Sequence, residues 1–130
     1  MKRRTGQRGS VTLEAVLVLP VLLLSIMAIV QVVIFAHASR LADAAAREGT
    51  RALRLSGRVN DGRTRAEGFL QQHGAQMVLE PVIAARSVGG LASVDVSGRA
   101  VAVVPGISFP VHGHSAGPLE AFTAAAKVTP

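Results

Sequence analysis

The sequence predicts an α+β fold: a long N-terminal transmembrane helix, then a small domain with a short helix and a β-hairpin or few-stranded antiparallel sheet. Three observations predict it. A long uncharged apolar segment follows a basic leader, small residues continue beyond it at helical spacing, and short valine-rich runs separated by Gly and Pro occupy the distal part. A chain of 130 residues is enough for one small domain.

The apolar segment runs from Ala15 to Ala36, where the only polar side chains are Ser25 and Gln31 and no residue is charged. As a helix it spans roughly 33 Å, close to the thickness of the hydrocarbon core of a bilayer. Pro20 lies inside it and is expected to kink the helix slightly, which membrane helices tolerate. We therefore expect residues 15–36 to cross a membrane in contact with lipid.

The orientation follows from the charges beside this segment. Residues 1–9 carry four basic side chains and no acidic one. The far flank, 39–67, is also rich in arginine, with acids mixed in. Because a short basic leader is not readily translocated, we expect the N-terminus in the cytoplasm and the rest outside the membrane, with one span.

A cleaved secretory signal peptide is the competing interpretation of the N-terminus. Ala36-His37-Ala38 supplies an A-x-A-like site. However, the apolar segment is longer than the 7–15 residues typical of signal peptides. Glu14 also lies near its start.

The helix is expected to continue to residue 56, because small and apolar residues recur along one of its faces. They are Ala38, Leu41, Ala42, Ala45, Gly49, Ala52 and Leu53. This face permits close approach of another element. It packs either against the chain's own distal domain or against a neighbouring subunit, and the pattern favours neither alternative.

A small extracytoplasmic domain is expected over residues 57–111. The stretch from Gly57 to Gly62 is interpreted as a break. Thr64 and Glu67 have the spacing of a capping box, which predicts a helix from Thr64 to about His73, closed by Gly74.

Strands are expected after this helix. Met77–Leu79 and Val82–Ile83 are short candidates, and Pro81 between them predicts a sheet edge or a bend. Val94 and Val96, then Ser97-Gly98, then Val101 and Val103 predict a hairpin that ends by Pro110. Residues 112–130 are assigned to a Gly/Ala/Pro-rich tail without stable order, apart from a short helix at 119–126.

The composition excludes several classes of function. There is no cysteine, so disulfides and thiolate chemistry are absent. The net charge of +6 invites nucleic-acid binding, but Trp and Tyr are missing and no reading helix is recognisable, so we expect no nucleic-acid partner. His112 and His114 lack further ligands nearby for a metal site. No nucleophile–base arrangement or nucleotide fingerprint is present, and we predict no enzymatic activity, cofactor or metal.

The start of the apolar segment carries a more specific pattern. Arg8 and Gly9 precede Ser10, Glu14 is the fifth residue after Gly9, and Pro20 follows within "EAVLVLPVLLL". This arrangement resembles the prepilin cleavage motif and is similar to TadE-like proteins, the minor pseudopilins of Tad/Flp tight-adherence pili. "ASRLADAAAREGTRAL" resembles the helix that follows the membrane segment in that family.

The resemblance implies a structural or assembly role. It implies cleavage of leader 1–9 between Gly9 and Ser10 by a prepilin peptidase, and incorporation in, or priming of, a pilus built from other pilin subunits and the assembly machinery. It also implies that Glu14 meets the new amino terminus of a neighbouring subunit. A carboxylate in a layer of low dielectric constant needs such a partner. An anchored or secreted binding module unrelated to pili is the alternative.

Overall fold

The computed structural model describes residues 4–120, with side chains from residue 9 onward. Helix α1 (Arg4–Ser56) is followed by helix α2 (Val59–His73) and by three strands, β1 (Val78–Val88), β2 (Leu91–Ala100) and β3 (Phe109–Pro118). The strands form one antiparallel sheet in the order β1-β2-β3. The predicted α+β fold with its long N-terminal helix is confirmed.

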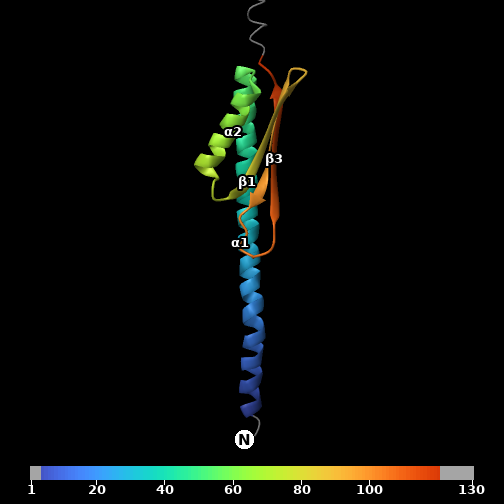
Figure 1. Cartoon of the computed structure of the whole chain (residues 1–130). Coiled ribbons are helices and arrows are strands. Elements are labelled where there is room, and N and C mark those ends of the chain that lie inside the picture. The colour runs from blue at the N-terminus through green and yellow to red at the C-terminus, as the bar shows by residue number, and fades with distance from the viewer. Residues whose placement is uncertain (1–3, 121–130) are drawn as a thin grey trace, which may run out of the picture.

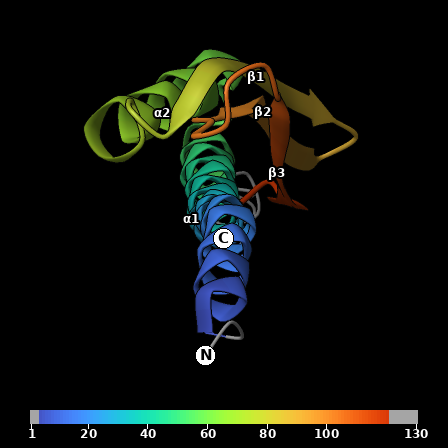
Figure 2. The ribbon, with the colours of Figure 1, turned by 90° about the horizontal axis from the view of Figure 1, so that it is seen from below.

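The domain is built on the C-terminal half of α1, and the N-terminal half extends away from it alone (Figure 1). Seen from below, α2 and the sheet gather around the far half of α1 (Figure 2). Both helices contact the sheet: α1 packs mainly on β2 and β3, and α2 on β1. The sheet gains a dry face in this way, which a three-stranded sheet needs for stability.

The core lies between the helices and the inner face of the sheet. β2 alternates as a half-buried strand should: Ala92, Val94 and Val96 point inward, while Ser93 and Asp95 do not. The face of small residues on α1 packs against this layer, with Ala38, Ala42, Ala45, Ala46 and Leu53 fully buried. Of the two roles left open for this face, the structure assigns it to packing within the chain's own domain.

Two glycines allow α1 to approach its neighbours closely. A Cβ on Gly113 of β3 would overlap the backbone of Ala42 and Asp43 in α1. A Cβ on Gly49 would lie 2.8 Å from the carbonyl oxygen of Gly62 in α2. Backbone contact of this kind is available only where a side chain is absent.

The second helix begins earlier than predicted. α2 starts at Val59, so the break is confined to Gly57 and Arg58, and Arg58 at the N-cap makes no side-chain capping bond. The predicted capping box at Thr64 is wrong, because Thr64 lies in mid-helix. Its partner Glu67 instead pairs with Arg63, 3.9 Å away. The end at His73 and the C-cap at Gly74 are confirmed; the Gly74 N–H donates to the carbonyl of Leu70.

The strands differ from the prediction in where the chain turns. The β1–β2 turn is at Gly89-Gly90, which both have positive φ, and Val88 pairs with Leu91. The predicted turn at Ser97-Gly98 is wrong. Gly98 lies inside β2, where a Cβ would come within 2.8 Å of the Val78 side chain, so it serves close packing and not a turn.

The region after β2 also departs from expectation. Val101 and Val103 lie in a loop and not in a strand. Residues 112–118, expected to lack stable order, form most of β3, which pairs with β2 along its whole length. Most of the expected helix at 119–126 falls outside the described residues. The prediction for Pro81 is confirmed, since β1 is an edge strand whose pairing shifts between Leu79 and Val82.

Candidate functional site

The residues predicted to matter for processing and assembly all lie on the free half of α1. Gly9, Ser10, Glu14 and Pro20 are exposed, and α1 continues through Pro20 as one helix. A Cβ built on Gly9 would have no atom within 4 Å. The structure therefore brings these residues together along one helix and leaves them clear of the domain.

Glu14 is the one charged residue between Gly9 and Ala36. Its neighbours Leu13 and Leu17 are exposed, and Glu14 is one helical turn from Ser10. Within the described part of the chain, its side chain makes no hydrogen bond or ion pair. A charge placed this way lacks a partner in the described part of its own subunit.

The free half of α1 exposes large apolar side chains on all sides. They run from Val11 to Val33, and α1 is long and apolar enough to cross a membrane. The Ser25 hydroxyl donates to the carbonyl of Val21 at 2.8 Å, so this polar group is satisfied within the helix. By length and composition, the single apolar helix suggests membrane anchoring.

Gln31 is a buried polar residue whose role sequence reasoning missed. Its side chain is only 4% exposed, and its Nε2 donates to the carbonyl of Val101 at 3.0 Å. The Val103 N–H donates to Gln31 Oε1 at 2.7 Å. A glutamine in an apolar segment needs a polar partner. That partner, the carbonyl of Val101, lies 70 residues away along the chain, and only the fold reveals it.

The contact of α1 with the domain therefore starts inside the segment predicted to span the membrane. From Gln31 the contact continues to Ala38, which is fully buried. The A-x-A-like site that ends at Ala38 is thus part of an unbroken helix packed against the core.

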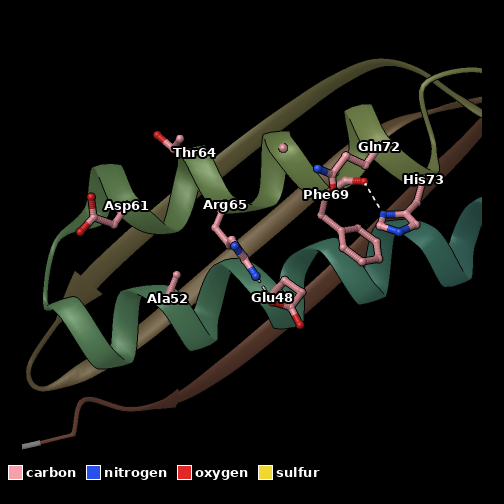
Figure 3. A pocket seen from close by; sticks show the side chains of 9 residues that line it. Glu48, Ala52, Asp61, Thr64, Arg65, Phe69, Gln72 and His73 are labelled. Carbon is pink, nitrogen blue, oxygen red and sulfur yellow. Dashed lines mark hydrogen bonds and ion pairs between the residues drawn. The ribbon is translucent and has the colours of Figure 1, made fainter.

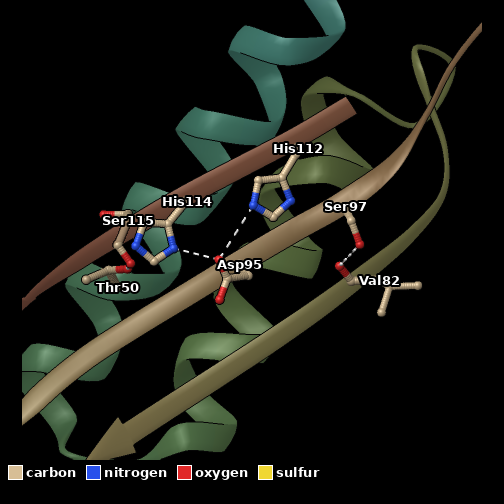
Figure 4. Close-up of polar contacts among 7 residues, drawn as sticks. All are labelled: Thr50, Val82, Asp95, Ser97, His112, His114 and Ser115. Carbon is tan, nitrogen blue, oxygen red and sulfur yellow. Dashed lines mark hydrogen bonds and ion pairs between the residues drawn. The ribbon is translucent and has the colours of Figure 1, made fainter. Parts of the chain in front are cut away.

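A second polar cluster occupies the outer face of the sheet (Figure 4). His112 and His114 lie on one side of β3, as their spacing indicated, and both face Asp95 of β2, which the sequence analysis did not connect with them. Oδ1 of Asp95 lies 2.6 Å from Nδ1 of His114 and 3.7 Å from Nε2 of His112. In the described residues, no group of three or more His, Cys, Asp or Glu is arranged to hold a metal ion.

An open hollow of about 630 Å³ lies between α1 and α2 (Figure 3). Its lining holds an ion pair between Arg65 and Glu48, with 3.5 Å between the charged atoms, and a stack of the Phe69 and His73 rings. The ion pair joins α2 to α1, whereas the ring stack lies within α2. The ion pair therefore engages Glu48, the charged side chain that α1 contributes to the lining of the hollow.

Comparison with known protein families matches residues 9–51, about a third of the chain, to the family of TadE-like proteins. No curated protein and no solved structure matches the chain. The TadE-like family suggests a Tad pilus-associated protein with a structural role, which implies contact with other pilus components. The resemblance seen in the sequence is confirmed over the helix that carries Gly9, Glu14 and Pro20, and this helix is the part of the chain that is similar to TadE-like proteins.

Proposed function

We propose that this protein is a minor pilin or pseudopilin of a Tad-type pilus, incorporated in the pilus or priming its assembly after a prepilin peptidase cuts between Gly9 and Ser10. One observation carries the proposal. The family match begins at Gly9, on a helix half that is free of the domain and in which Glu14 is the one charged residue from Gly9 to Ala36, with no partner among the described residues. A helix of this kind is built to be covered by lipid and then by other subunits.

Gly9 suits a cleavage site. A protease binds its substrate in an extended form, so the helix must unwind locally around the cut. Glycine lowers the stability of a helix by about 1 kcal/mol relative to alanine, and the exposed position leaves no tertiary contact to break.

Cleavage also gives Glu14 a partner. It creates an ammonium group at Ser10, and in a layer of low dielectric constant an opposite charge offsets much of the cost of the carboxylate. Since Glu14 has no partner among the residues that the structure describes, we assign it to the amino terminus of a neighbour. The pair would fix the axial register between subunits.

The same proposal places the leader in the cytoplasm and the α+β domain outside, with lipid around the free half of α1 before assembly. The basic leader supports this orientation. The competing candidate, an anchored or secreted binding module, is weakened in its signal-peptide form. A cut after Ala38 would open a fully buried position and remove Gln31 from the domain.

N-terminal sequencing of protein extracted from membranes tests the cut. The proposal expects a mature chain that begins at Ser10. A start at Ser39 would identify a signal peptide, and an intact leader a plain anchor; either result contradicts the proposal. Gly9→Val should block processing, whereas Gly6→Val in the same leader is the matched control and should leave it intact.

The role of Glu14 needs a separate test. Glu14→Ala and Glu14→Gln should both leave the folded domain unchanged, because Glu14 contacts none of it. Recovery of either variant in sheared pili should fall at least tenfold while its membrane level stays normal. Val18→Ala, one turn further along the same helix, is the control. Normal incorporation of Glu14→Gln would rule out the charge pairing.

A further inference from the structure

The loop between β2 and β3, residues 101–108, lies at the end of the domain nearest the free half of α1 (Figure 1). It is held there by Gln31, which bonds the backbone of Val101 and Val103. The loop therefore occupies a fixed height along α1.

The loop lies in a stretch without charge and exposes apolar side chains. From Ala100 to Val111 no residue is charged, and Ser108 is the only polar side chain. Val103 and Ile107 are exposed by 38% and 49%. Ionisable residues flank the stretch on both sides, Arg99 before it and His112 after it, with side chains 48% and 64% exposed.

The position along α1 matches the edge of a bilayer. If the hydrocarbon begins near Ala15, just past Glu14, Gln31 lies roughly 24 Å further along a helix that rises about 1.5 Å per residue. The hydrocarbon core is about 30 Å thick. Gln31 is thus about 6 Å short of the far edge of the hydrocarbon. The loop bonded to it lies beside the upper acyl carbons, next to the headgroups, and its exposed apolar side chains continue the apolar surface of α1.

We propose that loop 101–108 is a second membrane contact, which enters the interfacial layer of the bilayer beside α1. The inference rests on the membrane anchoring in the proposed function. It adds a specific lipid-binding surface outside the helix. With two points of contact, the height of the domain above the bilayer and its tilt relative to the bilayer normal are set before it meets another subunit.

The depth of this contact is limited by the backbone. The loop has no helical or strand structure, and only some of its N–H and C=O groups bond within the chain, as Val101 and Val103 do. Unpaired backbone groups are too costly in hydrocarbon. The loop therefore stays among headgroups and upper acyl carbons, with Val103 and Ile107 pointing to the lipid.

Single cysteines test the contact directly, because the chain has none of its own. Ile107→Cys reports on the loop, Leu22→Cys on the apolar helix, and Val88→Cys on the far hairpin; all three positions are exposed, so circular dichroism should be unchanged. Each full-length variant is labelled with an environment-sensitive fluorophore and reconstituted in vesicles of phosphatidylcholine and phosphatidylglycerol. Quencher groups are placed at a shallow or a deep acyl carbon.

The probe at position 107 should be blue-shifted and quenched at least twofold more by the shallow quencher than by the deep one. The probe at 22 should prefer the deep quencher, and the probe at 88 should respond to neither. If 107 behaves like 88 while 22 is quenched, the loop contact is wrong and the anchoring stands. If 22 is not quenched, the anchoring itself fails. A signal at 107 that grows with protein density at constant lipid would identify a second copy as the occupant and overturn the proposal.

Discussion

At the residue scale, the buried amide of Gln31 links the free half of α1 to the domain. Gln31→Leu keeps the size and removes both hydrogen bonds, leaving the Val103 N–H unpaired. We expect the free energy of unfolding to fall by about 1–3 kcal/mol. Denaturant unfolding in mild detergent measures it. Ser25→Ala, which removes a hydrogen bond within the helix only, is the control and should stay within about 0.5 kcal/mol; equal effects would contradict the linking role.

Glycine is required at position 113 for a different reason. A Cβ there would overlap the backbone of α1 at Ala42, so Gly113→Ala must push β3 and α1 apart. We expect a loss of about 1–3 kcal/mol, the usual cost of overpacking. Gly68→Ala in α2 is the matched control, since its Cβ would meet no atom, and it should raise stability by up to about 1 kcal/mol. Thermal unfolding distinguishes the two, and a neutral Gly113→Ala would contradict the close contact.

At the scale of elements, the β1–β2 hairpin depends on its turn. Gly89 and Gly90 have φ values of 60° and 79°, as a two-residue turn of type I′ requires. Gly90→Val should lower stability by about 1–2 kcal/mol, because a β-branched residue is strained at positive φ. Gly89→Asn should be close to neutral, since asparagine tolerates this region. Similar denaturation midpoints for both variants would mean that the turn conformation is not what limits stability.

At the scale of the whole molecule, the domain and the free half of α1 are separable at Gln31. A fragment that begins at Ile26 keeps every buried residue of α1. We expect its urea midpoint in mild detergent to equal that of the full chain. A fragment that begins at Ser39 loses Gln31 and Ala38 and should be less stable by at least about 2 kcal/mol. Equal midpoints for the two fragments would show that residues 26–38 contribute nothing to the domain.

Much of this protein could be predicted from local patterns in its sequence. The apolar segment, its basic leader and the spacing of Gly9, Glu14 and Pro20 are properties of neighbouring residues, and the α+β class follows from periodicity. Burial of the face of small residues on α1 was also expected, although its partner was left open. The roles of Gly9 and Glu14 remain proposals, because they depend on a cut and on a neighbouring subunit.

Only the tertiary structure decided which glycines turn the chain and which permit contact. Gly98 looked like a turn but lies inside β2, and residues 112–118 looked like a tail but pair with β2 as β3. Likewise, the hydrogen-bond partner of Gln31 lies in a distant loop, and Asp95 contacts two histidines of the next strand. The physical reason is the same in each case. Strand register and close packing bring together residues that are far apart in the chain, and the local sequence does not determine which distant residues become neighbours.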